Sequence, residues 1–211
     1  MDTVLIVSRT KMKEGVCVDA IIETTGESIR LHDERGANLA KDAEYQIGQE
    51  WEMDVQKPWN SRPEPHLEDR QIRSPKYVNT VDMAMLVSSI KKSKCNIIHG
   101  GVQKLFDGAL VSGCGSSKQQ PMYINEKNVP NHSVAFWIAD KDLVMKVSTF
   151  NGQKKVYYVY DNTFKISYVG FQSALTIIPQ GTMIRMSLAS WWKPDDASEK
   201  RCYLQLSGWY L

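Results

Sequence analysis

Short apolar runs, many of them alternating with polar residues, recur along most of the chain and predict β-strands. The clearest alternation lies between Ile47 and Val55, where Trp51, Met53 and Val55 are separated by acidic residues. Side chains two positions apart share one face of a strand, so this pattern predicts a half-buried strand with an acidic face. Other strands are predicted at Val4–Val7, Val16–Ile22 and Ser28–Leu31. Short strands separated by turns are typical of a small barrel.

A second group of strands is expected after residue 133. The predicted strands are Val134–Ile138, Leu143–Phe150, Lys155–Tyr160, Phe164–Val169, Met183–Leu188 and Cys202–Leu206. Asn151-Gly152 and Asp161-Asn162 supply hairpin turns, because these residue types tolerate the positive φ angles of tight turns. The sequence therefore predicts a second barrel, closed by the last two strands of the chain.

Between the two β-rich regions the spacing of apolar residues becomes helical. An amphipathic helix is predicted from Met83, Leu86, Val87 and Ile90, with Thr80 as its cap, and a shorter helix from Val102, Leu105, Phe106 and Ala109. Three prolines make Lys57–Ser74 an extended loop. The expected organisation is an N-terminal barrel with its Pro-rich loop (1–78), a helical and loop insertion (79–132) and a C-terminal barrel (133–211).

Composition narrows the class of protein. The chain has 211 residues, of which 42% are apolar and 24% charged, as in ordinary globular proteins. No apolar run approaches the roughly 20 residues that span a bilayer, and the first residues are typical of a strand rather than a signal peptide. We therefore expect a cytoplasmic protein that does not enter a membrane.

Charge is unevenly distributed along the chain. Residues 1–80 hold 11 Lys and Arg against 15 Asp and Glu, whereas residues 81–211 hold 15 against 9. A basic second part suits a polyanionic ligand such as nucleic acid. The alternative interpretation is that the asymmetry only keeps the fold soluble.

The strongest binding pattern interleaves lysine and tyrosine on one predicted hairpin. Alternation places Lys155 and Tyr157 on one face of a strand and Tyr158 and Tyr160 on the other. On the next predicted strand, Lys165 lies on the face that is not apolar. Lysine with an exposed aromatic ring can bind single-stranded nucleic acid by charge and stacking. The candidate nucleic-acid-binding residues are Lys154, Lys155, Tyr157 and Lys165. The alternative is an ordinary solvated strand.

Other chemical signals are weaker. His66, Glu68 and Asp69 are close enough in sequence to suggest a metal or acid–base site, but hydrogen bonds that lock the loop explain them more simply. No pair of the four cysteines Cys17, Cys95, Cys114 and Cys202 has metal or redox spacing, so we expect buried free thiols. Gly108–Lys118 lacks the spacing of a phosphate loop. We expect no enzyme activity, cofactor or metal.

Three tryptophans near the end of the chain allow two interpretations. Trp191, Trp192 and Trp209 would form a stacking or partner surface if exposed, and would fill a small barrel if buried. Large aromatic side chains dominate small cores, so we expect core packing.

Several short motifs resemble one protein family. They are Leu5-Ile6-Val7-Ser8, the segments 15–20 and 25–31, Arg62-Pro63-Glu64-Pro65-His66-Leu67-Glu68-Asp69 and the ending 205–210. Together they resemble the dual OB-containing domain proteins of bacterial conflict systems, which are encoded beside effector and NTPase genes of anti-phage defence. The resemblance implies two small OB-like barrels in tandem, an all-β fold with a helical insertion, and a sensing or adaptor role.

Two functional hypotheses follow. In the first, the chain binds nucleic acid, in single-stranded form, as an accessory subunit of a defence assembly. In the second, it is an adaptor whose acidic first barrel and Trp-rich end dock an effector or NTPase protein without nucleic acid. A hydrolase that uses His66, Glu68 and Asp69 is the third and weakest alternative.

Overall fold

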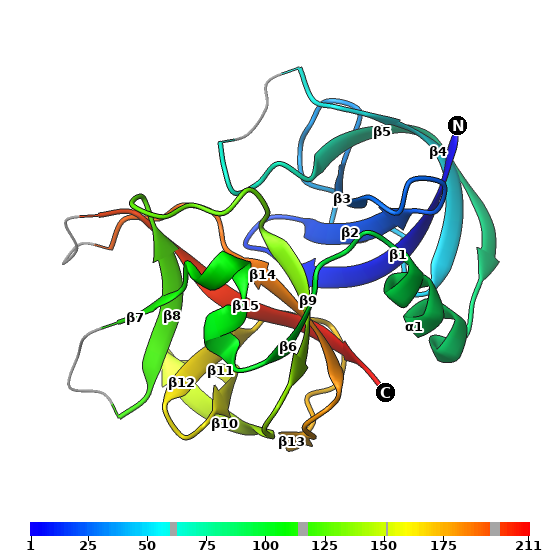
Figure 1. Cartoon of the computed structure of the whole chain (residues 1–211). Coiled ribbons are helices and arrows are strands. Elements are labelled where there is room, and N and C mark those ends of the chain that lie inside the picture. The colour runs from blue at the N-terminus through cyan, green and yellow to red at the C-terminus, as the bar shows by residue number, and fades with distance from the viewer. Residues whose placement is uncertain (60–62, 114–117, 151, 195–198) are drawn as a thin grey trace. The chain divides into compact units, whose positions relative to one another are not determined.

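The protein is described by a computed structural model that covers residues 1–59, 63–113, 118–150, 152–194 and 199–211 (Figure 1). Contacts between residues divide the chain into two compact units. The first comprises Met1–Asn96 with Tyr210–Leu211, and the second comprises Ile97–Trp209. Both units consist mainly of β-strands, which confirms the predicted fold class.

The first unit is a closed five-stranded barrel. Its strands are β1 (Asp2–Lys11), β2 (Val16–Ile22), β3 (Ser28–His32), β4 (Gln49–Gln56) and β5 (Asp69–Thr80). They follow the order β1-β2-β3-β5-β4, and β4 pairs back with β1 to close the ring. All neighbours are antiparallel except β3 and β5, which are parallel.

The core of the first barrel follows the predicted alternation. Val4 and Ile6 of β1 and Trp51 and Met53 of β4 are buried in one apolar cluster. Glu52 stands between the last two and is partly exposed. The half-buried strand with an acidic outer face is therefore confirmed, because burial of every second side chain fixes the register of a strand.

The predicted loop Lys57–Ser74 is wrong at its end, because β5 already begins at Asp69. The three prolines of the predicted loop all precede this strand, but β5 itself contains Pro75. The pairing of β4 with β5 shifts between Glu52 and Asp54, so Ser74 and Pro75 form a bulge with no partners in the register. A bulge accepts a proline inside a strand because that residue has no ladder hydrogen bond to donate.

The predicted amphipathic helix is present as α1 (Met83–Lys92), with Leu86 and Ile90 buried. Its cap is Asp82 rather than Thr80, which ends β5. The Oδ1 atom of Asp82 accepts a hydrogen bond from the backbone N–H of Met85 at 2.8 Å. Aspartate caps a helix well, since its carboxylate also complements the positive end of the helix dipole.

The second predicted helix is wrong. The segment instead forms two 3₁₀ turns, η1 (Val102–Lys104) and η2 (Phe106–Gly108). Phe106 and Asp107 have φ angles of 52° and 58°, which an α-helix does not accommodate. The four apolar residues are nevertheless buried, so their spacing predicted the buried face correctly but not the backbone.

The second unit contains the remaining strands in one ten-stranded sheet. They are β6 (Ile97–Gly100), β7 (Val111–Ser112), β8 (Gln120–Asn125), β9 (Val134–Ala139), β10 (Leu143–Phe150), β11 (Gln153–Tyr160), β12 (Phe164–Tyr168), β13 (Ile177–Ile178), β14 (Met183–Leu188) and β15 (Arg201–Tyr210). The main path runs β13-β10-β11-β12-β8-β15-β14-β9-β6, with β7 on β8 and an extra pairing of β12 with β15. The six strands predicted after residue 133 are all present, each within a few residues of its expected ends.

Strand pairing shows that this sheet contains the barrel order of the first unit. Only residues 140–142 separate β9 from β10. These two strands together therefore correspond to β1, the first strand of the first barrel, with a short interruption. From there the ring runs β10-β11-β12-β15-β14 and returns to β9. The pairing of β12 with β15 is parallel, as is that of β3 with β5. Two OB-like barrels in tandem are therefore present, the second enlarged by β6, β7, β8 and β13.

A glycine permits the close approach of β12 and β15. A Cβ atom on Gly170 would lie 2.3 Å from the carbonyl oxygen of Ser207, closer than any side chain tolerates. The core of this barrel contains Trp137, Tyr158 and Trp209, all at most 5% exposed. A rigid apolar interior thus supports the outer face of β11 and β12.

Candidate nucleic-acid interface

The lysines and tyrosines singled out in the sequence lie on the hairpin of β11 and β12. Lys155 and Tyr157 point to the outer face of β11, whereas Tyr158 and Tyr160 are buried in the core. On β12, Lys165 pairs with Val159, two positions along β11 from Tyr157, so Lys165 and Tyr157 share the same outer face. The predicted division of the hairpin into an apolar face and a lysine–tyrosine face is confirmed.

Tyr157 is held in place at both its ring and its hydroxyl group. The Nζ atom of Lys165 lies 4.2 Å from the centroid of the Tyr157 ring, within the range of a cation–π contact. The Tyr157 hydroxyl donates a hydrogen bond to Oε1 of Gln119 at 3.2 Å. A half-buried ring that is fixed in this way is preorganised for stacking, which lowers the entropy cost of binding.

The structure adds a third lysine that the sequence analysis missed. Lys146 of β10 stands directly opposite Tyr157 in the antiparallel register and is exposed. Directly opposed side chains lie about 5 Å apart at Cβ, so Lys146 shares the outer face with Tyr157. Counting back from the Asn151-Gly152 turn would have found this pairing. We define the Lys–Tyr face as Lys146, Lys155, Tyr157 and Lys165.

Lys154 is placed differently from the other candidate residues. It is exposed and pairs with Thr149 near the end of the hairpin. Because Lys154 directly precedes Lys155 in β11, the two residues belong to opposite faces of the strand. Side chains of successive strand residues point to opposite faces. The structure therefore brings Lys155, Tyr157 and Lys165 together and leaves Lys154 outside the Lys–Tyr face.

In the barrel order, β11 and β12 are the second and third strands. OB folds bind oligonucleotides on the face of these two strands and on the loops beside them. The Lys–Tyr face thus occupies the part of the barrel on which this fold most often carries ligands. Between Ile97 and Trp209 the chain also holds 12 Lys and Arg against 8 Asp and Glu, so the unit is basic.

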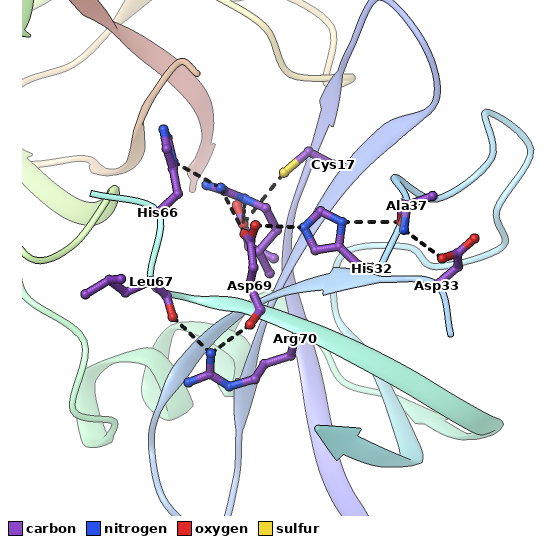
Figure 2. A network of polar contacts seen from close by, with 10 residues as sticks. Cys17, His32, Asp33, Ala37, His66, Leu67, Asp69 and Arg70 are labelled. Atoms are coloured by element: carbon purple, nitrogen blue, oxygen red, sulfur yellow. Dashed lines mark hydrogen bonds and ion pairs between the residues drawn. The ribbon is translucent and has the colours of Figure 1, made fainter. Parts of the chain in front are cut away.

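The same face of the first barrel has the opposite character. On β2 and β3 this face carries Asp19, Arg30 and His32 instead of lysines and a tyrosine. The side chains of these three residues are buried, with exposures of 2%, 8% and 3%. Figure 2 shows the polar network to which they belong. The Nε atom of Arg30 lies 3.5 Å from Oδ1 of Asp19. Because these groups are buried and engaged with one another, their charges are not available to the phosphates of a nucleic-acid strand.

Asp69 is the centre of this network. Its Oδ1 atom lies 3.3 Å from Nη1 of Arg30, and its Oδ2 atom lies 3.2 Å from Nε2 of His32. The second ring nitrogen of His32 lies 3.3 Å from the carbonyl oxygen of Ala37, so both nitrogens face an oxygen (Figure 2). The network thereby joins β3, the start of β5 and the β3–β4 loop.

His66 joins the same network through the loop between β4 and β5. Its Nδ1 atom lies 3.3 Å from Nη1 of Arg30. His66, Glu68 and Asp69 are all at most 8% exposed. We expected such residues to lock the loop by bonding nearby backbone, but His66 and Asp69 instead hold the side chain of a residue more than 35 positions away. Sequence spacing does not reveal which distant strand a loop will contact.

Electrostatics in this network favour structure over chemistry. Burial alone would lower the pKa of the Arg30 guanidinium. The nearby Cys17, Asp19 and Asp69 together raise this pKa by more than burial lowers it, so the guanidinium stays charged. Burial, and then the charge of Asp19, raises the pKa of the Cys17 thiol to about 11. A thiol with so high a pKa is a poor nucleophile at neutral pH. Among the described residues no group of three His, Cys, Asp or Glu side chains has the geometry of a metal site.

The three tryptophans do not behave alike. Trp209 is 5% exposed in the core and Trp191 packs against that core, as expected. Trp192 is 56% exposed, with its ring 6.0 Å from that of Tyr203, so core packing is wrong for this residue. It lies past the end of β14, where its backbone pairs with Arg201 of β15 but its ring stays outside the core. Cys17, Cys95 and Cys202 are free thiols, of which only Cys202 is fully buried, and Cys114 lies outside the described residues.

Comparison with protein families agrees with the strand order. A family model that describes the dual OB-containing domain matches residues 2–209. The chain belongs to this family. A search of curated proteins and a search of solved structures each returned no match.

The match covers both barrels of the dual OB domain, together with the strands that enlarge the second. OB-fold domains generally act as binding modules for nucleic acids or proteins rather than as enzymes. In the part of the chain that the structure describes, no helix has the length and apolar character needed to cross a membrane. The Lys–Tyr face is consequently the strongest candidate for the binding surface of this dual OB domain.

Proposed function

We propose that the chain binds single-stranded nucleic acid on the Lys–Tyr face of its second barrel. One observation carries the proposal: Tyr157 of the second strand of an OB barrel stands among Lys155 of the same strand, Lys165 of the third and Lys146 of the first. The lysines neutralise backbone phosphates, and the tyrosine ring offers a base a stacking surface. Neither interaction reads the base sequence, so the expected binding is tolerant of sequence.

The first barrel supports this assignment by contrast. Its equivalent face carries a buried ion-pair network in place of accessible lysines, so it offers a polyanion no comparable cations. We infer that the two barrels have separate tasks, and that the second one holds the nucleic acid. The division matches the uneven charge along the chain.

The proposal is tested by fluorescence anisotropy with a labelled single-stranded oligonucleotide at low salt. We expect saturable binding, and weaker binding to a duplex of the same sequence, because stacking on Tyr157 needs an unpaired base. Binding that is undetectable at low salt would refute the proposal.

The resemblance stated above supports a place in an anti-phage defence assembly with an effector or NTPase partner. One observation also favours an adaptor role without nucleic acid, namely the 56% exposure of Trp192 beside Tyr203. Tryptophan and tyrosine are enriched at the centres of protein interfaces. Affinity purification with and without nuclease distinguishes the two: a partner that stays bound after nuclease treatment, and is lost with Trp192→Ala, supports the adaptor.

A further inference from the structure

A pocket of about 200 Å³ opens on the first barrel. Three segments of this unit form it: the β3–β4 loop with Arg35 and Gly36, the β4–β5 loop with Trp59, and the start of β5 with Gln71. His32 and Asp69 of the buried network complete its wall. The pocket thus borders the network that fixes these loops.

Trp59 is the most exposed large apolar side chain of the described residues, with 97% of its surface accessible. By comparison, Trp51 in the same barrel is 4% exposed and packs in the core. Leaving an indole in water forfeits the free energy of burying it, and the fold gains no packing in return. An exposed indole beside a pocket is, however, well suited to stack against a flat ring.

Two polar side chains of the pocket are available to a ligand. Neither the guanidinium group of Arg35 nor the amide group of Gln71 makes a hydrogen bond or ion pair with the residues that the structure describes. Gly36 keeps the loop close to Gln71: its φ angle is 80°, and a Cβ atom there would lie 3.1 Å from Nε2 of Gln71. The pocket therefore offers one cation and one donor–acceptor pair.

The other charged groups of the pocket are already engaged. Nη1 of Arg70 donates to the carbonyl oxygens of Leu67 and Asp69, at 2.9 and 2.8 Å. The Asp69 carboxylate is held by Arg30 and His32. These contacts leave Arg35 as the cation that can receive an anionic group.

We propose that this pocket binds a single nucleotide unit, with the base against Trp59, its edge toward the amide of Gln71 and its phosphate toward Arg35. The volume lies below the roughly 300–1,000 Å³ of pockets that enclose most of a ligand, so the nucleotide would be held only in part and would remain partly in solvent. The proposal does not rest on the Lys–Tyr face, because every residue that carries it belongs to the first barrel.

The test is isothermal titration calorimetry of the full chain with adenosine 5′-monophosphate, adenosine and inorganic phosphate. We expect the nucleotide to bind, and to bind more tightly than adenosine or phosphate. Trp59→Ala should weaken nucleotide binding about tenfold, since loss of one base–aromatic stack is of that order. Arg35→Ala should reduce nucleotide affinity to that of adenosine. Both side chains are exposed, so these variants keep the fold, which circular dichroism verifies.

A control variant checks that the loss is specific to the pocket. Lys76→Ala removes an exposed cation further along β5 and should leave nucleotide binding unchanged. Displacement of the nucleotide by a short oligoadenylate would assign the pocket to a nucleotide within a strand, and retention would assign it to a free nucleotide. Equal affinity for adenosine and its phosphate, or a nucleotide affinity that is unchanged in Trp59→Ala, would overturn the proposal.

Discussion

Lys165 holds its ammonium group over the ring of Tyr157, with Nζ 4.2 Å from the ring centroid. The contact joins the two neighbouring strands of the second barrel on which an OB fold carries its ligand. It combines the two interactions that unpaired nucleic acid requires, namely a cation for the phosphate and an aromatic face for the base.

Replacing Tyr157 separates the contribution of the ring from that of the hydroxyl group. Tyr157→Ala should weaken binding of a single-stranded oligonucleotide by about 1–3 kcal/mol, because it removes the stacking surface. Tyr157→Phe should bind nearly as well as the native protein, since it loses only the hydrogen bond to Gln119. Fluorescence anisotropy measures both. An equal loss in the two variants would mean that the hydroxyl group, and not the ring, contacts the ligand.

The lysines of the Lys–Tyr face should determine the salt dependence of binding. For single strands the logarithm of affinity falls with the logarithm of salt concentration by roughly 0.7 for each neutralised phosphate. The triple variant Lys146→Ala, Lys155→Ala and Lys165→Ala should therefore reduce this slope by about 2. Lys127→Ala is the control. β12 pairs with the first residues of β8, whereas Lys127 lies beyond the last residue of that strand. An unchanged slope in the triple variant would place the phosphates elsewhere.

The two adjacent lysines of β11 provide a sharper comparison. Lys155→Ala should weaken oligonucleotide binding more than Lys154→Ala, although both remove one charge from neighbouring positions. The difference arises because alternation places only Lys155 beside Tyr157. Competition titrations of the two variants measure it. Equal effects would show that overall charge near the hairpin end, rather than one face, attracts the ligand.

The buried network should be essential to the stability of the first barrel. Asp69→Ala leaves Arg30 without one buried partner, and breaking a buried ion pair typically costs about 3–5 kcal/mol. Urea unfolding followed by circular dichroism measures the change. Asp54→Ala serves as the control, since its contact with the N-terminus is about half exposed and should be worth less than about 1 kcal/mol. Similar losses in the two variants would contradict a structural role for the network.

The thiol of Cys17 should react only at high pH. Burial and the charge of Asp19 raise its pKa to about 11, so the folded state favours the neutral thiol. The resulting stabilisation is complete below the pKa of the unfolded thiol, near 8.5, and is lost as the pH rises through about 11. Alkylation with iodoacetamide, mapped to the Cys17 peptide by mass spectrometry, should accelerate up to that pH. A plateau below pH 9 would contradict the raised pKa of this thiol.

Much of the fold could be predicted where one side of a strand is buried. Trp51 and Met53 predicted β4, because burial of every second side chain places apolar residues at every second position of the sequence. β5 was missed because its second half is exposed and contains Pro75, so neither apolar pattern nor composition marks it. The turns at Phe106 and Asp107 were missed because apolar spacing reports burial but not φ angles.

The candidate site was partly predictable for the same reason. Lys155 and Tyr157 are two positions apart on one strand, so alternation alone placed them together. Lys146 joins them through the register of the β10–β11 hairpin, which the predicted turn at Asn151-Gly152 would have given. The role of His66 depends on the distant Arg30, and that contact is set by tertiary folding, so no local pattern carries it.

The most direct measurement compares single-stranded oligonucleotide binding by the native chain, by the Lys155→Ala, Tyr157→Ala and Lys165→Ala triple variant, and by Lys127→Ala, all at low salt. If the Lys–Tyr face is the binding surface, the triple variant loses at least tenfold in affinity while Lys127→Ala remains like the native chain. Unchanged binding by a folded triple variant would contradict the account.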